Sequence, residues 1–224
     1  MSKEKLLQMQ IALFFDKIED RPDKLMDKID DALGGVFDQM PTILPIPPDA
    51  PPEVPSVIMN SSNGIYNCNI ARSRIDFQIN YANSHNSISI NIEEFVEKAR
   101  PFASLIFGFK NITRFGLVGQ YFFRNSDPLK KIQKKYLKND LGDLEELSIR
   151  YNKRFEHNGI LMNNLVEVSK GAYMENGRAQ QFGVFIQRDM NNIPVDSLKI
   201  EDVISLIVSY QNDFKLSGIK GLVE

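Results

Sequence analysis

Cysteine, histidine and tryptophan are scarce in this chain of 224 residues, which has one cysteine, two histidines and no tryptophan. The single cysteine, Cys68, excludes an internal disulfide and fits a reducing compartment. A typical zinc site would need carboxylates to complete it, and no Cys-x-x-Cys or His-x-x-x-His pair is present. We therefore expect no metal and no other cofactor.

Motifs of the common enzyme classes are also missing. Gly34-Gly35 follow a predicted helix instead of a strand, and no Gly-Lys-Ser or Gly-Lys-Thr occurs, which excludes a standard phosphate-binding loop. No Gly-x-Ser-x-Gly nucleophile elbow occurs either. Of the paired carboxylates Glu93-Glu94, Glu145-Glu146 and Glu201-Asp202, two pairs begin predicted helices, where the helix dipole favours acidic side chains. We name no catalytic residue, and an enzyme with an unrecognised carboxylate-based site stays as an alternative.

A strong net charge and a long apolar segment are absent as well. The formal net charge is −2, so overall electrostatics favours neither nucleic acid nor an acidic membrane as a partner. Residues 1–7 lack the apolar region of a signal peptide, and no apolar run reaches the roughly 18 to 20 residues that span a bilayer. We expect a cytoplasmic protein that does not contact membranes.

Hydrophobic periodicity predicts a mixture of strands and helices. Alternation of apolar and polar residues predicts strands at 7–15, 57–59, 66–70, 75–81, 113–123, 147–155, 160–169 and 181–188. Apolar spacing of three and four residues predicts helices at 22–37, 92–107, 128–138 and 200–214. The turns His157-Asn158-Gly159 and Glu175-Asn176-Gly177 predict tight hairpins.

Particular residues refine this assignment. Proline recurs through 41–55, which predicts an extended surface connector because proline removes a backbone donor and fixes φ. Asn91 and Glu94 have the spacing of a capping box, and Pro101 predicts a kink or a break in the helix at 92–107. The phase of Cys68 predicts a buried, unreactive thiol, whereas His157 is predicted to be exposed beside its turn.

The order of these elements repeats along the chain. Phe14-Phe15 matches Phe122-Phe123, and Ile92-Glu93-Glu94-Phe95 matches Ile200-Glu201-Asp202-Val203 at the same offset. We therefore predict an α+β fold that is a tandem duplication of a β-α-β-β-β-α unit, with antiparallel sheets and helices packed on one face. The first unit covers residues 1–108, with the connector at 41–55, and the second covers 109–224. The two units are expected to form one compact domain.

Two stretches resemble a known family. Arg114-Phe-Gly-Leu-Val-Gly-Gln-Tyr121 resembles a strand of the type Arg-x-Gly-Leu-Arg-Tyr, and the proline-rich connector leads into Ser56-Val-Ile-Met-Asn-Ser-Ser-Asn-Gly64. Together with length and element order, they resemble a sporadically distributed family of uncharacterised bacterial proteins. The chain departs from that pattern at 118–120. The resemblance implies no activity and no site residues.

The most distinctive charge feature is a cluster of lysines in the predicted helix at 128–138. At 100° per residue these lysines fall within about 140° of arc, which makes an amphipathic helix with a basic face. Such a face is usually solvated, and otherwise it contacts phosphate or an acidic partner. The corresponding helix at 22–37 is acidic, so the two helices are candidates for pairing between subunits or within one chain. The basic residues are Lys130, Lys131, Lys134, Lys135 and Lys138.

Arginines on predicted strands complete the candidate binding surface. Arg72 and Arg74 belong to the first half, and Arg150 and Arg154 belong to the second. Most strand faces and edges rich in Arg and Asn are only solvated, but such surfaces can also recognise peptides or nucleic acid. We predict a non-catalytic binding or assembly protein, a homodimer with a protein or peptide as further partner. A nucleic-acid-binding protein that uses the lysine helix and these arginines is the first alternative.

Overall fold

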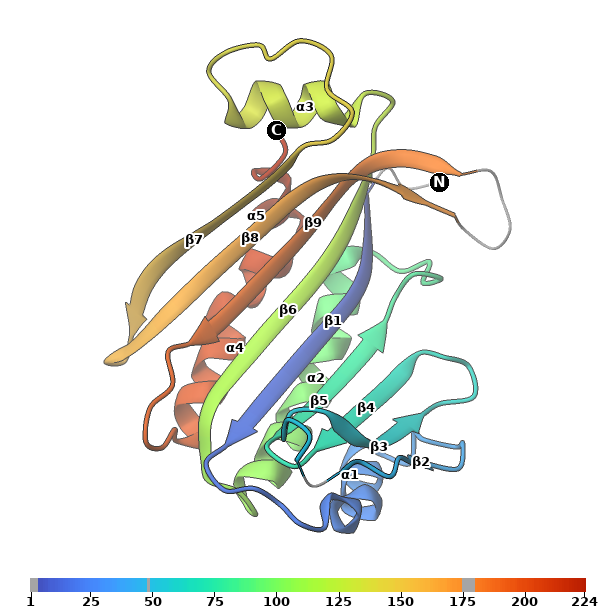
Figure 1. Cartoon of the computed structure of the whole chain (residues 1–224), viewed down its shortest axis with the longest axis vertical. Coiled ribbons are helices and arrows are strands. Elements are labelled where there is room, and N and C mark those ends of the chain that lie inside the picture. Colours follow the sequence, from blue (N-terminus) through green and yellow to red (C-terminus); the bar gives the residue numbers. More distant parts are fainter. Residues whose placement is uncertain (1–3, 48, 175–179) are drawn as a thin grey trace.

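One open antiparallel sheet is the centre of the structure (Figure 1). The computed structural model describes residues 4–47, 49–174 and 180–224. Within these residues the sheet has nine strands in the order β2-β3-β4-β5-β1-β6-β9-β8-β7. The strands are β1 (Glu4–Phe15), β2 (Thr42–Ile43), β3 (Pro55–Asn60), β4 (Tyr66–Ala71), β5 (Arg74–Asn80), β6 (Ile112–Arg124), β7 (Ser148–His157), β8 (Ile160–Tyr173) and β9 (Gln181–Asn192).

The predicted fold class is therefore wrong. The prediction gave each of two duplicated units its own sheet, whereas β1 pairs with β6 along most of its length and makes one sheet of the whole chain. Alternation identifies a strand and its buried face, but it does not identify the strand beside it. β1 and β6 are both long and largely apolar on one face, and each obtains two neighbours in the middle of the sheet.

Helices cover one face of this sheet. In Figure 1 α2 and α4 lie behind the strands, α1 lies at the lower end and α3 lies at the upper end. Among the described residues these are the 3-10 helix η1 (Pro22–Leu25) and the helices α1 (Met26–Leu33), α2 (Ile88–Phe107), α3 (Pro128–Tyr136), α4 (Ile200–Phe214) and α5 (Leu216–Lys220). None of the described helices is both long enough and apolar enough to cross a bilayer.

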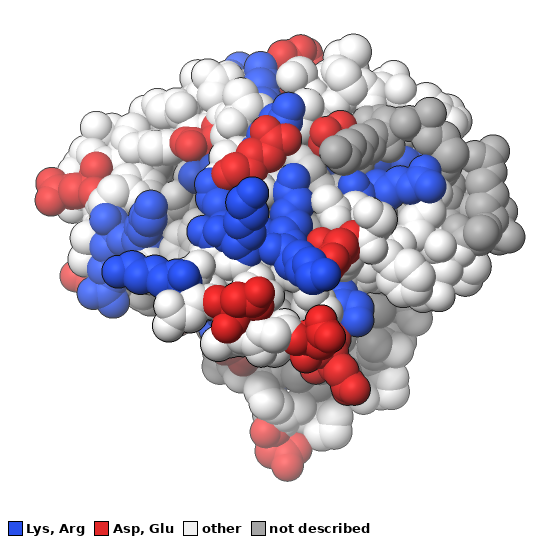
Figure 2. Space-filling model, turned by 90° about the horizontal axis from the view of Figure 1, so that it is seen from above, with Lys and Arg blue, Asp and Glu red and all other residues white. Residues whose placement is uncertain are grey.

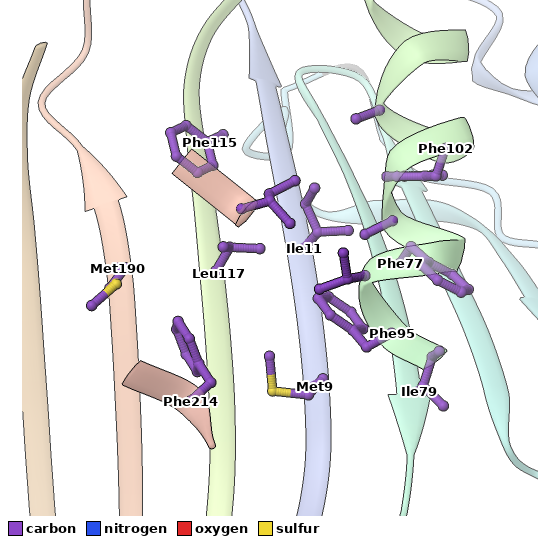
Figure 3. Packing of buried hydrophobic residues seen from close by; sticks show 14 of the residues in the cluster. Met9, Ile11, Phe77, Ile79, Phe95, Phe102, Phe115, Leu117, Met190 and Phe214 are labelled. Carbon is purple, nitrogen blue, oxygen red and sulfur yellow. The ribbon is translucent and has the colours of Figure 1, made fainter. Parts of the chain in front are cut away.

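The hydrophobic core lies between the sheet and the helices (Figure 3). Met9 and Ile11 of β1 and Leu117 of β6 extend from the strands into this layer, where they meet aromatic residues such as Phe95 of α2 and Phe214 of α4. Burial of such side chains contributes about 1.5 to 3 kcal/mol each. Because side chains alternate along a strand, the residues between these positions face away from the helices.

Several element predictions are confirmed with shifted ends. The predicted helix at 22–37 is η1 followed by α1, which ends at Gly34 with a φ of 85°. The predicted helix at 92–107 begins four residues earlier in α2, so Ser87 caps it and the predicted capping box of Asn91 and Glu94 is wrong. Pro101 does not divide this helix. It lies on the exposed side, away from the core.

The three predicted loops and turns have different outcomes. The proline-rich connector at 41–55 contains the short edge strand β2, which pairs with β3 through Thr42 and Ile43. The turn at Asn158-Gly159 is confirmed, since both residues have positive φ, of 50° and 78°. The predicted turn at 175–177 lies outside the described residues.

The side chain of Asn192 forms hydrogen bonds at the point where β6 and β9 separate. The ladder between these strands ends at Gly116 and Asn191, and beyond it the fully buried side chain of Asn192 takes the place of backbone pairing. Its Oδ1 accepts from the N–H of Phe115 at 2.8 Å, and its Nδ2 donates to the carbonyls of Thr113 at 3.1 Å and Ile193 at 2.8 Å. The side chain thus gives the N–H of Phe115 an acceptor where the ladder has ended, and it adds a second donor to the carbonyl of Thr113, which also accepts from the N–H of Val195.

We expect Asn192→Ala to lower the free energy of unfolding by about 2 to 3 kcal/mol, because the buried N–H of Phe115 would lose its acceptor. Asn152→Ala is the matched control, since Asn152 is exposed on β7 and donates to a single side chain, Asn163. It should change the free energy by about 0.5 kcal/mol or less. Urea denaturation followed by circular dichroism measures both, and equal losses in the two variants would contradict this role of Asn192.

Candidate binding surfaces

The predicted lysine cluster lies on α3 at one end of the molecule. Ile132 and Gln133 are buried beneath the helix, and Tyr136 donates its hydroxyl to the carbonyl of Leu222 at 2.7 Å. This packing turns the lysines outward, and Figure 2 shows lysine and arginine side chains gathered over this end with acidic side chains around them. Lys130, Lys134, Lys135 and Lys138 are exposed and Lys131 is half-buried, and Lys138 lies beyond the end of the helix.

Two lysines of this cluster have partners within the chain. Lys130 lies 3.5 Å from the carboxylate of Asp127, and Lys135 donates to the carbonyl of Glu224. The acidic helix α1 lies at the opposite end of the molecule (Figure 1), so the two helices do not pair within one chain. The cluster is therefore a solvated basic face in the isolated chain.

The four predicted arginines occupy three different environments. Arg72 follows β4 and donates to the carbonyl of Ala50 at 2.6 Å, which ties the proline-rich connector to the sheet. Arg74 on β5 pairs with Asp76 at 2.8 Å. Arg150 and Arg154 lie on the outer strand β7, where Arg150 is 3.9 Å from Glu167. At about 4.8 Å per strand, β5 and β7 are separated by roughly 24 Å.

The predicted residues therefore do not form one surface. Arg74, Arg150 and Arg154 face away from the helices, whereas α3 packs on the helical side through Ile132. A single ligand that contacts the lysine helix would have to pass around the end of the sheet to reach these arginines. The structure instead separates a basic helix, a basic outer strand and a pair of arginines near the connector.

The open face of the sheet carries rows of polar side chains whose alignment across the strands the sequence analysis did not predict. Strand register aligns polar side chains across the sheet, and one row consists of Asn80, Gln8, Gln120, Gln187, Glu167 and Arg150. The amide of Gln120 donates to Gln187 at 3.2 Å. Alternation in single strands predicts polar residues on this face, but the rows depend on register between strands that are far apart in sequence.

A second group of amides links the outer strands. Asn152 of β7 donates to Asn163 of β8 at 2.8 Å, Asn163 donates to Asn191 of β9 at 3.1 Å, and Asn191 donates to Asp189 at 2.9 Å. Each amide in the middle of this chain both donates and accepts. These contacts hold side chains on three strands in fixed orientations, so this part of the open face is ordered before any ligand arrives.

Asp76 is a largely buried carboxylate on the open face. It accepts from Arg74 Nε at 2.8 Å and from Gln10 Nε2 at 2.9 Å. Burial nevertheless raises the pKa of Asp76, because the loss of hydration outweighs the attraction of Arg74 and the hydrogen bond from Gln10. Asp76 is thus held by two fixed donors in a position where its negative charge is unfavourable.

Other candidate groups have structural explanations. Cys68 is fully buried, and burial raises the pKa of its thiol, which confirms the predicted unreactive core residue. His157 was predicted to be exposed, but its ring contacts Tyr210 and its Nε2 lies 3.3 Å from Ser205 Oγ. Glu94 accepts from the Tyr66 hydroxyl, and burial together with this carboxylate raises the pKa of Tyr66 to about 12. Among the described residues no group of three or more His, Cys, Asp and Glu side chains could hold a metal ion.

Comparison with known proteins supplies no relative, since neither the protein-family models nor the curated proteins give a match to this chain. The resemblance to the family of uncharacterised bacterial proteins stays a prediction. The surfaces must therefore be interpreted from their own chemistry.

The raised pKa of Asp76 makes a pH-dependent prediction. The folded state binds this proton more tightly than the unfolded state, so Asp76 contributes stability at low pH that is lost as pH rises from about the ordinary value of 3.8 through the raised pKa. Asp76→Asn lacks that contribution. The free energy of unfolding of the variant minus that of the parent chain should therefore increase with pH across this acid window. Urea denaturation at a series of pH values measures the difference, and a flat or falling profile would contradict the assignment.

Proposed function

We propose that this chain is a non-catalytic binding protein that receives an extended acidic segment of a partner protein along the free edge of β7. The observation that supports the proposal is that β7 is a long strand at the edge of the sheet. β7 is ten residues long, and among the residues that the structure describes it has one neighbouring strand, β8. Alternate backbone N–H and C=O groups of an edge strand point away from its neighbour, where another strand can pair with them.

The other edge of the sheet is of a different kind. It ends in β2, which is two residues long and lies within the proline-rich connector. A strand this short, flanked by prolines, offers few backbone groups to a partner. The comparison supports β7 as the edge at which the sheet can be extended.

Partly buried aromatic residues beside β7 support binding of a further strand at this edge. On the helical side Tyr151 contacts Tyr136 of α3, with ring centroids 6.1 Å apart, and Phe155 contacts Tyr210 of α4 at 5.0 Å. All four rings are only partly buried. An added strand would place alternate side chains next to these rings and cover apolar surface that is now partly exposed.

Charge identifies the class of partner. β7 carries Arg150, Lys153 and Arg154 against a single acid, Glu156, and all four are exposed. Basic residues on an edge oppose pairing with another basic strand. A second copy of this chain, the partner in the predicted homodimer, would bring its own three basic residues against these. An acidic segment would instead be attracted to the edge and held in register.

The alternatives have less support. A nucleic acid would have to bind the lysines of α3 without the strand arginines, because the two groups face different sides of the sheet. A carboxylate-based enzyme would need convergent acidic groups, and Asp76, the buried carboxylate of the open face, is held by Arg74 and Gln10. Neither alternative uses the edge of β7.

A labelled peptide of alternating glutamate and valine tests the proposal by fluorescence anisotropy. We expect saturable binding that the double variant Arg150→Glu, Arg154→Glu weakens about tenfold or more, since the attraction becomes repulsion. The double variant Lys130→Glu, Lys134→Glu is the matched control, because it makes the same change of charge on α3. It should bind the peptide as the parent chain does.

A peptide N-methylated at alternate residues separates strand pairing from simple charge attraction. It keeps every glutamate but lacks the N–H groups of one edge, so it should bind at least about tenfold more weakly. Equal binding of the two peptides would contradict strand addition. Binding of a single-stranded oligonucleotide that only the α3 variant abolishes would favour the nucleic-acid alternative, and a dimer in light scattering that the β7 variant dissociates would favour a second copy.

A further inference from the structure

A second site is suggested on the open face, some distance from β7, by three residues in one row. Strand register places Phe14 of β1 directly between Arg74 of β5 and Arg114 of β6. The guanidinium carbon of Arg74 lies 4.8 Å from the centre of the Phe14 ring, and that of Arg114 lies 5.1 Å from it. The two cations therefore flank one aromatic ring, and cation–π attraction holds both guanidinium groups against it.

The two guanidinium groups differ in their partners. Arg74 is neutralised by Asp76, which accepts from its Nε and lies 2.8 Å from its Nη2. Arg114 has no carboxylate partner within the residues that the structure describes. Its Nε is buried and has no hydrogen-bond acceptor there. Among the described residues, therefore, no carboxylate forms an ion pair with Arg114.

A guanidinium without such a partner is energetically unfavourable in this place. Arginine stays charged and has five N–H donors in a planar fork. Contact with the Phe14 ring attracts the charge but accepts none of these hydrogen bonds in the plane of the fork. A buried donor without an acceptor is unfavourable. An oxyanion at the part of the guanidinium that reaches solvent would supply the missing counter-charge.

Arg114 is half-buried, so part of its side chain reaches solvent, whereas the small residues beside it are buried. The next row along the strands contains Ala12 of β1 and Gly116 of β6. A Cβ at Gly116 would meet Asn191 and Asp189 only at ordinary contact distances of 3.6 and 3.8 Å, so packing does not require glycine there. A ligand would therefore reach the guanidinium from the solvent side of Arg114, and Asp189, held by Asn191, borders Gly116 with negative charge.

We propose that Arg114, together with Arg74 and Phe14, forms a binding site for a single oxyanion, a carboxylate or a phosphate group. A planar carboxylate or a phosphate matches the guanidinium fork in two parallel hydrogen bonds. Arg74 contributes attraction while Asp76 holds it in place, and Asp76 limits the affinity by its own negative charge. The site is independent of the β7 edge.

The Nε–Hε resonance of Arg114 in a nitrogen-15 correlation spectrum reports on the site directly. Inorganic phosphate and succinate are titrated separately, with sodium chloride of equal ionic strength as reference. We expect a saturable shift of this resonance with phosphate, with succinate or with both, and the comparison identifies which oxyanion the site prefers. Shifts that stay linear with both anions, or that sodium chloride reproduces, would overturn the proposal.

Variants distinguish the site from general anion binding. Amide shifts of neighbouring residues should show binding weakened at least about tenfold in Arg114→Gln, which keeps a polar side chain but loses the charge. Arg124→Gln removes an exposed arginine from the end of the same strand and should leave affinity unchanged. Asp76→Asn should strengthen binding by roughly threefold, since a nearby negative charge is lost. Unchanged affinity in Arg114→Gln, or weaker binding in Asp76→Asn, would count against the site.

Discussion

The pairing of β1 with β6 is the contact on which the rest of the structure depends. These two strands lie next to each other in the middle of the sheet, and each has a further antiparallel neighbour, β5 or β9. The helices that follow those neighbours, α2 and α4, pack on the same face and contact each other. The ladder therefore joins the halves of the chain within the sheet, and the contact of α2 with α4 joins them within the core.

This central pairing also determines where polar groups collect. With the helices on one face, alternate side chains of nine strands form the other face as a continuous surface. Two separate sheets would have divided that surface and would not have placed Phe14 between arginines of different halves. The amide rows, the guanidinium pair and the long outer strand are thus consequences of one sheet.

The sequence predicted single helices and strands correctly, but it did not predict which strands lie next to each other. Apolar spacing predicted the helices, and alternation predicted β1, β6 and the outer strands, because burial of one face is imposed on each element separately. The fold class failed because the choice of neighbouring strand is not contained in alternation. The lysines of α3 were found since a helix brings them together within eleven residues of the sequence. Phe14 and Arg114 come together only through register between β1 and β6, so no local signal could find them.

The exposed lysines of α3 and the half-buried Arg114 differ in how water and neighbouring groups solvate their charge. Exposed lysines on a helix interact with water, and their mutual repulsion is screened over about 10 Å at ordinary ionic strength. A half-buried guanidinium has less water to replace a missing partner, so its demand for an acceptor is stronger. No cluster of charge in the sequence marks Arg114, but its buried Nε lacks an acceptor among the described residues. We expect such a charge to influence binding more than several solvated ones. Candidate sites in a sheet of this kind are therefore better ranked by burial and missing partners than by the density of charged residues.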